Sequence, residues 1–303
     1  MTTPLLVADT TPAWADGPVV SYREVLGAPP EPGVLVFLGF PYVHWDAAIE
    51  GRLPAVYGTR AYAEALKDYL GRVGTALDGA SFVNPPAAVA VTRDKLAMKR
   101  VLREAGVPTP RAYTPGSREE LRELIGGGLY VKAVCGSMGK GITHLTPGRW
   151  RTGYLFDGTA LRSPQGEHWP PREVPLGTDA LLDALCATDG FLFEEEIRGD
   201  ELRVTVVDGE VLRVDPPGTL SEDAAARVRE ATSAGARALS LRYAVFDVLL
   251  DARRRPYLID VQAFPALETP PDLWRLVVDR LTRETPQEGR TVPCRQTRSS
   301  STL

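Results

Sequence analysis

The sequence predicts an α+β protein with more than one compact domain. Its 303 residues suffice for two or three cores, and 44% hydrophobic with 24% charged residues is ordinary for a globular protein. Apolar β-rich runs and segments with helical spacing follow one another along the chain, and some of the runs stand close enough to pair as hairpins. These observations together predict a chain of mixed helices and sheets.

The first 85 residues predict a small N-terminal α/β domain. Residues 33–40 form an apolar β-rich run, and residues 59–77 carry apolar side chains at helical spacing. The Asn84-Pro85-Pro86 cluster then breaks regular structure. A domain joint is therefore expected near residue 85.

Helix and strand signals follow the joint. A helix is predicted to begin after Thr92, which would be its N-cap, and to end at Gly106. From Leu129 the chain reads as short strands on either side of a glycine-rich loop. Residues 148–175 show no firm periodicity and are expected to form an irregular insertion, and a strand is expected at 191–197.

The last third predicts a hairpin, a helix and a second hairpin. Asp208-Gly209 is a turn dipeptide between two β-rich runs, and Ser221 precedes a helical segment that it can cap. The runs 243–250 and 256–264 form the second hairpin. Residues 286–303 have almost no apolar side chains and are expected to be a disordered tail.

Charge and composition argue against several functional classes. The net charge of −4 gives no field that would attract nucleic acid or an anionic membrane. The chain shows neither a signal peptide nor the roughly 20 apolar residues that span a bilayer. Its three cysteines and three histidines are scattered, which argues against a disulfide framework or a zinc site. We expect a cytoplasmic protein that binds neither nucleic acid nor membrane, and a homodimer stays open.

The second hairpin carries the strongest chemical signal. Side chains alternate along a strand, so Asp260 and Gln262 share a face. A turn centred at 253–254 would place Asp247 opposite Asp260. Two carboxylates that face each other in an apolar sheet need a cation between them, and Mg²⁺ with bound phosphates would meet that need. The alternative is that one aspartate points outward while the other pairs with an arginine such as Arg242 or Arg253.

A loop and a lysine indicate a bound anion. The three glycines of the loop 136–141 let backbone N–H groups approach an anion closely. Lys132 lies four residues before the loop in an apolar strand, where a buried ammonium needs a carboxylate or a phosphate. The alternatives are an ordinary glycine-rich turn and an edge-strand lysine that reaches water.

Three glutamates, Glu194 to Glu196, stand in a row at the end of a strand, so at least two must face different ways. Either Glu194 and the backbone as far as Ile197 meet a polar ligand, with Glu201 contacting another part of it, or the run is a solvated edge.

In this order the motifs resemble those of the ATP-grasp superfamily, over residues 92–285. TRDKLAMKRVLREAGVPTPRAY is similar to the helix that opens the grasp domain, and YVKAVCGSMGKGI to its lysine strand and phosphate loop. FEEEIRGDELRV resembles the hinge that receives adenine, and VFDVLL with YLIDVQAFPAL resembles the pair of metal-binding strands. The resemblance implies an ATP-grasp fold whose two α+β subdomains, 92–198 and 199–285, enclose ATP after the N-terminal α/β domain 1–85.

The resemblance also implies roles for individual residues. The nucleotide phosphates would contact two lysines and the loop: Lys95, Lys132, Gly136, Ser137, Met138, Gly139, Lys140 and Gly141. The adenosine part would contact Glu194, Glu195, Ile197 and Glu201, and one or two Mg²⁺ ions would bind Asp247, Asp260 and Gln262. Candidate catalytic residues that recognise a carboxylate or an acyl phosphate are Arg203, Arg213 and Arg242, each equally a candidate for a structural ion pair.

This sequence departs from the family pattern at two places. The family often has proline where this chain has Ala133, and commonly has Glu and Asn where it has Asp260 and Gln262. The second departure changes the reach of both predicted metal ligands.

The implied activity is that of a ligase that uses ATP and Mg²⁺. It would activate a small-molecule carboxylate as an acyl phosphate for attack by an amine, with amino acids or peptides as substrates, and bacterial specialised metabolism is a setting in which such ligases often serve. DELRVTVVDGEVLRV resembles the RimK-like peptide ligases, within a broader likeness to D-alanine–D-alanine ligase, whereas IDVQAFPAL resembles the inositol-phosphate kinase branch. A small-molecule kinase and a catalytically lapsed nucleotide-binding protein are the alternatives.

Overall fold

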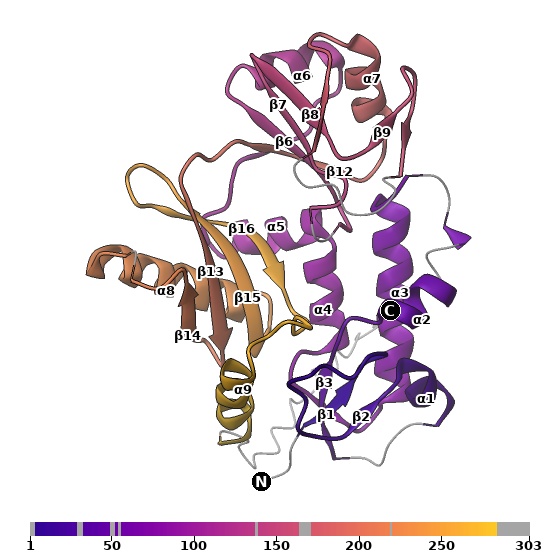
Figure 1. The fold of residues 1–303 in the computed structure, drawn as a ribbon, viewed down its shortest axis with the longest axis vertical. Coiled ribbons are helices and arrows are strands. Elements are labelled where there is room, and N and C mark those ends of the chain that lie inside the picture. The colour runs from indigo at the N-terminus through magenta and orange to yellow at the C-terminus, as the bar shows by residue number, and fades with distance from the viewer. Residues whose placement is uncertain are drawn as a thin grey trace, which may run out of the picture.

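Three main sheets, with helices packed against them, make up the part of the chain that the structure describes (Figure 1). The computed structural model describes residues 4–28, 33–48, 52–53, 56–136, 139–163, 171–218 and 220–283. Ser137 and Met138 of the expected phosphate loop, and the expected disordered tail 286–303, lie outside these residues. None of the described helices is long and apolar enough to cross a membrane.

The N-terminal part is a parallel four-stranded sheet in the order β2-β1-β3-β4. Its strands are β1 (Leu5–Val7), β2 (Val19–Val20), β3 (Leu35–Leu38) and β4 (Ser81–Phe82), and its helices are α1 (Tyr22–Gly27), α2 (Tyr42–Ala48) and α3 (Arg60–Ala76). The helix predicted at 59–77 is confirmed as α3, which buries Leu66, Leu70 and Val73 at helical spacing.

Two short helices, α4 (Pro86–Arg93) and α5 (Lys95–Glu104), lead from this sheet to the rest of the chain. The prediction that Thr92 caps one continuous helix is wrong. Thr92 is buried in the last turn of α4, where its hydroxyl donates to the Val89 carbonyl, and the Asp94 side chain caps α5 by accepting from the Ala97 N–H at 3.0 Å. Aspartate caps well, so a new helix starts one residue after it.

A six-stranded sheet in the order β11-β8-β7-β6-β12-β5 carries α6 (Arg118–Ile125) and α7 (Asp179–Ala187) (Figure 1). Its strands are β5 (Ala112–Tyr113), β6 (Leu129–Ala133), β7 (Thr143–Thr146), β8 (Arg149–Thr152), β11 (Arg172–Val174) and β12 (Phe191–Glu195). The expectation of an irregular insertion at 148–175 is wrong for its described residues. Strands β8 and β11 extend the sheet there, and β9 (Leu155–Phe156) pairs with β10 (Leu161–Arg162). Strands this short leave almost no periodicity in the sequence.

The C-terminal sheet is antiparallel, in the order β14-β13-β15-β16. Its elements are β13 (Asp200–Val207), β14 (Glu210–Asp215), α8 (Glu222–Ala238), β15 (Tyr243–Leu250), β16 (Pro256–Gln262) and α9 (Pro271–Arg283). The Asp208-Gly209 hairpin is confirmed, with φ angles of 50° and 79° that suit these turn residues. Ser221 caps α8 as predicted.

A β-bulge in β16 sets the register of the second hairpin. Val248 pairs with Leu258, but the next residue back, Asp247, pairs with Asp260. Ile259 is therefore the additional residue of the bulge. The prediction that Asp247 lies opposite Asp260 is confirmed, although the bulge achieves it rather than a turn centred at 253–254.

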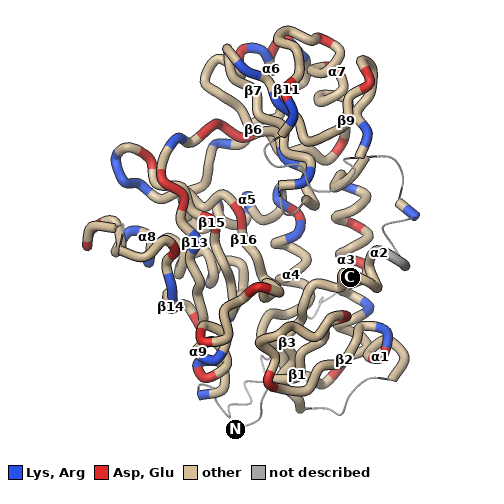
Figure 2. Tube along the Cα trace, viewed as in Figure 1, with Lys and Arg blue, Asp and Glu red and all other residues tan. Residues whose placement is uncertain are grey.

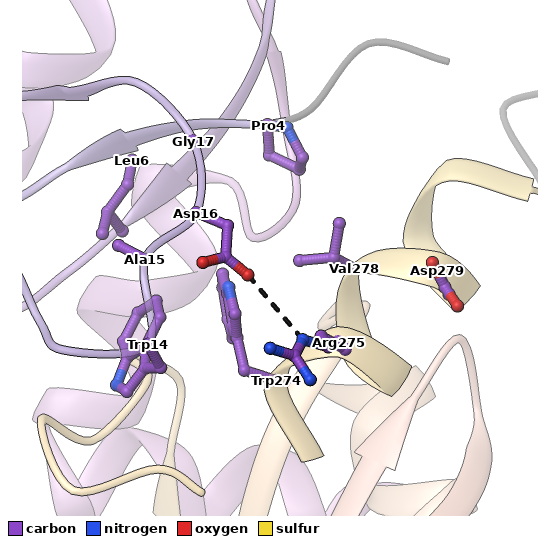
Figure 3. Close-up of a pocket in the computed structure, with 10 residues that line it drawn as sticks. All are labelled: Pro4, Leu6, Trp14, Ala15, Asp16, Gly17, Trp274, Arg275, Val278 and Asp279. Carbon is purple, nitrogen blue, oxygen red and sulfur yellow. Dashed lines mark ion pairs between the residues drawn. The ribbon is translucent and has the colours of Figure 1, made fainter. Parts of the chain in front are cut away.

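Asn84 and α9 fasten the N-terminal sheet to the C-terminal one. The Asn84 amide donates to the carbonyls of Tyr243 and Ala263, both at 2.8 Å. On α9, Trp274 packs on Trp14 with ring centroids 4.1 Å apart, beside a small hollow of about 140 Å³ (Figure 3). These contacts hold the ends of β15 and β16 against the N-terminal sheet.

Candidate active site

A cavity of about 620 Å³ lies between the six-stranded sheet and the C-terminal sheet. Most of the predicted site residues line it: Lys95, Lys132, Gly136, Gly139, Lys140, Glu194, Glu195, Ile197, Glu201, Arg203, Asp247, Asp260 and Gln262. Acidic and basic residues are spread along the described chain, and an acidic stretch marks the passage from β12 to β13 (Figure 2). Four glutamates of this passage line the cavity: Glu194, Glu195, Glu196 and Glu201. The fold thus gathers residues that are up to 167 positions apart, from Lys95 to Gln262.

The glycine-rich loop follows β6 into the cavity wall. Gly139 and Gly141 have φ angles of 70° and 78°, which glycine adopts without strain. A Cβ on Gly141 would lie 2.7 Å from the Tyr154 hydroxyl, so only glycine fits there. Lys140 stacks over the ring of Tyr57, with Nζ 4.0 Å from the centroid. Aromatic side chains therefore pack against the described part of the loop.

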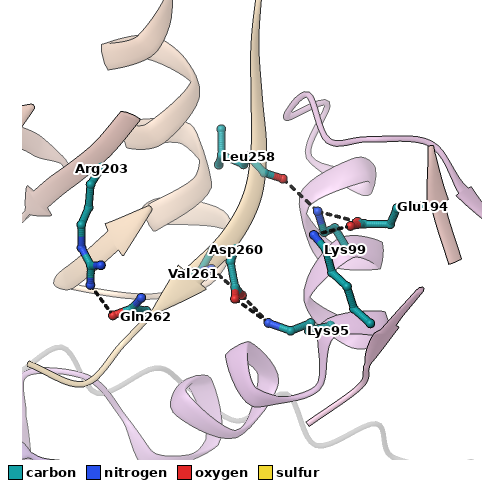
Figure 4. Close-up of polar contacts among 9 residues, drawn as sticks. Lys95, Lys99, Glu194, Arg203, Leu258, Asp260, Val261 and Gln262 are labelled. Atoms are coloured by element: carbon teal, nitrogen blue, oxygen red, sulfur yellow. Dashed lines mark hydrogen bonds and ion pairs between the residues drawn. The ribbon is translucent and has the colours of Figure 1, made fainter. Parts of the chain in front are cut away.

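A buried network joins the two sheets behind the cavity. Glu194 on β12 forms ion pairs with Lys99 of α5 at 2.7 Å and with Lys132 of β6 at 2.8 Å. Lys99 also donates to the Leu258 carbonyl of β16 at 2.9 Å (Figure 4). The side chains of Glu194 and Lys99 are only 1% and 2% exposed, whereas Lys132 is 15% exposed on the cavity side.

The protonation of this network follows from burial and pairing. Burial lowers the pKa of Lys99 to about 8, although Glu194 opposes the shift. Burial acts on Lys132 in the same direction, but the Glu194 carboxylate outweighs it and the pKa of Lys132 is raised. The pKa of Glu194 is lowered, because its two lysines outweigh its burial. Lys132 is thus held as a cation facing the cavity.

Lys99 was not among the predicted site residues. In the sequence it follows Met98 in an amphipathic helix and reads as one more charge on a solvated face. The available signal was its position: Lys95 and Lys99 are one helical turn apart, so a partner of one lies close to a partner of the other.

The opposite wall of the cavity carries the aspartate pair. Lys95 donates to both carboxylate oxygens of Asp260 at 2.6 Å (Figure 4). Burial would raise the pKa of Asp260, but Lys95 outweighs it and the pKa is lowered. Among the described residues no cation forms an ion pair with Asp247: its burial, and then the charge of Asp260, raise its pKa to about 6. A further positive charge next to Asp247 and Asp260 would therefore stabilise the ionised form of the pair.

The donor set fits a Mg²⁺ ion that is shared with phosphates. Among the described residues no three His, Cys, Asp or Glu side chains gather as a metal cluster, so the protein can offer Asp247, Asp260 and an amide. Mg²⁺ commonly binds through one or two carboxylates and completes its shell with substrate phosphates and water. The amide oxygen of Gln262 already accepts from Arg203 at 2.6 Å. An amide oxygen has two lone pairs, so Gln262 has one left for a metal ion.

Apolar and aromatic side chains also line the cavity. Tyr130 lines it together with Ile142, Leu249 and Ile259, and its ring stacks on His144 with centroids 4.2 Å apart. None of these was predicted, although Tyr130 and Lys132 alternate onto the same face of β6. The Glu195 carboxylate accepts from the Arg111 N–H at 2.9 Å, just before β5, and Glu195 also lines the cavity.

The structure separates the three candidate arginines. Arg203 lines the cavity beside Gln262. Arg213 binds both oxygens of Asp215, and Arg242 binds Asp208 and the Leu281 carbonyl. Within the described lining of the cavity neither of these two appears, so their geometry is that of structural ion pairs.

Sequence comparison finds no matching protein-family model and no matching curated protein. Solved structures do match. One is the ATP-grasp ligase PsnB complexed with a phosphomimetic variant of its minimal precursor, Mg and ADP, with a TM-score of 0.58 and 17% identity over 92% of this chain and 98% of that chain. The chain has the ATP-grasp fold.

Two further ATP-grasp structures support this result. D-alanine–D-alanine ligase from Bacillus anthracis complexed with ATP has a TM-score of 0.56 and 14% identity, over 93% of this chain and 97% of that chain. A RimK domain ATP-grasp protein from Sphaerobacter thermophilus has the same TM-score and 13% identity, over 90% of this chain and 95% of that chain. The predicted α+β ATP-grasp fold is confirmed.

Proposed function

We propose that this protein is an ATP- and Mg²⁺-dependent ligase that joins a carboxylate to an amine. The observation that carries the proposal is one cavity in which the Lys132 ammonium on one sheet faces the Asp247–Asp260 pair on the other. The ATP-grasp fold supports it, since PsnB and D-alanine–D-alanine ligase are ligases and their structures hold ADP with Mg, or ATP. In the proposed arrangement residues 1–85, 92–198 and 199–285 are three domains, and ATP binds between the last two.

Each wall of the cavity has a proposed part in nucleotide binding. Lys132 and the backbone of the loop 136–141 would bind the terminal phosphates. Asp247 and Asp260 would hold Mg²⁺, which supplies the positive charge that phosphoryl transfer needs. Lys95 is proposed to turn from Asp260 toward a phosphate when the nucleotide binds, because both groups compete for the same ammonium. Electrostatics thus favours phosphate on one wall and metal on the other.

The adenosine would lie against the passage from β12 to β13. The backbone between Glu195 and Ile197 is proposed to meet the base, and Tyr130 offers a ring that could stack on it. Glu201 lies at the start of β13 on the cavity lining and is proposed to accept from the ribose hydroxyls.

The proposed reaction has two steps. A carboxylate oxygen of the acid attacks the γ-phosphorus, an O–P bond forms, the bond to the βγ-bridging oxygen breaks, and ADP leaves. An amine nitrogen then attacks the acyl carbon, a C–N bond forms, the C–O bond to phosphate breaks, and the amine gives up a proton. Arg203, at the cavity wall, is the candidate to stabilise the negative oxygen that develops on the acyl carbon.

Incubation with ATP, Mg²⁺ and pooled amino acids and short peptides tests the proposal. A ligase releases ADP and inorganic phosphate and forms a product whose mass is the sum of acid and amine less one water. A kinase leaves the phosphate on its product instead. Tight binding of Mg-ATP without any turnover would mean a lapsed enzyme and would refute the ligase proposal. A cytoplasmic location and a homodimer stay predictions.

A further inference from the structure

Arg93 is a half-buried cation to which the described chain offers no carboxylate. It is the last residue of α4, and its Nε atom is buried without a hydrogen-bond partner among the described residues. The group beside it is the thiol of Cys135, whose pKa is raised by burial and held down in part by the charge of Arg93 and by a hydrogen bond with its side chain. A guanidinium withdrawn from water without an anion is costly, so the site is suited to an anionic ligand.

The side chain lies where the ends of two sheets meet. The Arg93 guanidinium carbon lies 5.4 Å from the ring centroid of Phe40, just beyond the carboxyl end of β3. The Phe40 ring in turn packs edge-on against Phe264, two residues after Gln262, with centroids 5.5 Å apart. Ligands of parallel α/β sheets bind at the carboxyl ends of the strands, which is the edge that Phe40 occupies.

Arg93 also lies beside the phosphate loop. The backbone N–H of Lys95, two residues further on, donates to the Val134 carbonyl at 3.0 Å, and the Cys135 N–H donates to the Gly58 carbonyl at 2.8 Å. The first bond fixes the α4–α5 junction against the chain just before the loop, and the second ties Cys135 to the N-terminal part of the chain. Arg93 is not among the residues that line the described cavity, and it lies at the border between the proposed phosphate site and the N-terminal sheet.

We propose that Arg93 binds the carboxylate of the acid substrate, an inference that rests on the proposed ligase function. The acid must bring its carboxylate to the terminal phosphate, which is proposed to lie under the loop that begins next to Arg93. Phe40 holds the guanidinium by a cation–π contact, and a guanidinium can bind a carboxylate through two parallel hydrogen bonds. The carbon skeleton of the acid would then extend along the carboxyl edge of the N-terminal sheet.

Ligand-observed NMR can test this before the natural acid is known. The probe is a mixture of N-acetyl amino acids, compared with the matching methyl amides that lack the carboxylate, in the presence of Mg²⁺ and a non-hydrolysable ATP analogue. The variants are Arg93→Gln and Arg93→Lys, with Arg100→Gln as the matched control, because Arg100 is exposed on α5.

Wild type and Arg100→Gln are expected to bind one or more acids of the mixture and none of the amides. Arg93→Gln should bind the same acids at least about tenfold more weakly, because the substitution removes a charge-assisted hydrogen-bonded pair. Its affinity for the ATP analogue should be unchanged. Arg93→Lys should fall between them, since it keeps the charge and loses the paired geometry. Retained nucleotide affinity shows that a variant is folded.

Two results would overturn the inference alone: a wild type that binds the nucleotide but no acid of the mixture, or an Arg93→Gln variant that binds the acids as wild type does. If Arg93→Gln fails to fold, Arg93→Lys decides, and unchanged acid affinity in it overturns the inference. A wild type that does not bind the nucleotide would instead overturn the proposed function, and the inference with it.

Discussion

Replacing Asp247 by Asn should stabilise the ligand-free protein while it weakens the binding of Mg²⁺ with nucleotide. Asp247 lies opposite Asp260 in the register of β15 and β16. Its burial, and then the charge of Asp260, raise its pKa from 3.8 to about 6. Asparagine has nearly the same shape without the charge, so the substitution removes the repulsion and leaves the packing.

The sign and size of the effect follow from the pKa. A carboxyl with a raised pKa holds its proton more tightly in the folded protein than in the unfolded chain. Its contribution to stability is therefore fully present below 3.8 and is lost as the pH rises through about 6. The difference between 3.8 and about 6 corresponds to about 3 kcal/mol at neutral pH. The Asp247→Asn variant has no carboxyl at this position and should escape the loss.

Urea unfolding at a series of pH values measures the effect. The free energy of unfolding of Asp247→Asn should exceed that of wild type at neutral pH and lack the wild-type decline between 3.8 and about 6. Mg²⁺ with an ATP analogue should stabilise wild type but hardly the variant. Asp78→Asn, which replaces an exposed aspartate just after α3, serves as the control. An Asp247→Asn protein no more stable than wild type at neutral pH would refute the reasoning.

Further substitutions, at Lys132, Lys99 and Asp260, test the cavity. Lys132→Ala should abolish ADP release, measured by coupled assay, and leave the circular dichroism spectrum unchanged, because Lys99 still pairs with Glu194. Lys99→Met should lower the free energy of urea unfolding by roughly 3–5 kcal/mol, since it leaves the Glu194 carboxylate with one lysine fewer, and adding Glu194→Gln should recover part of the loss. Asp260→Ala should eliminate the Mg²⁺ dependence of nucleotide binding in calorimetry, whereas Asp260→Glu should retain it; equal behaviour of the two would contradict a ligand role.

The strands with apolar runs and the capped helices could be predicted from the sequence, because their signals are local. The Asp208-Gly209 turn and the Ser221 cap each need only neighbouring residues. The N-cap at Asp94 was missed because Thr92 offers an equally plausible hydroxyl two residues earlier. Strands β8 and β11 were missed because they gain their stability from a neighbouring strand rather than from their own pattern.

The order of motifs in the sequence predicted which residues belong to the candidate site, but not which side chains they pair with. Lys132 was expected to need an anion, and the structure gives it Glu194, a residue that had been assigned to the adenine. Lys99 escaped because the sequence cannot show which charged residue of an amphipathic helix is buried. Gln262 stays a predicted metal ligand, and the sequence did not show that its amide oxygen also accepts from Arg203. Such pairings join distant segments, and only the fold brings them together.

The bulge at Ile259 changes what a single strand can offer. A regular strand turns alternate side chains toward a cavity, so of two consecutive residues only one would reach it. Here Ile259 and Asp260 both line the cavity. Adjacent positions of the chain thus supply an apolar side chain and a carboxylate to the same cavity. A substitution at Ile259 or at Asp260 changes only one of these two contributions, because the backbone that carries the other stays in place.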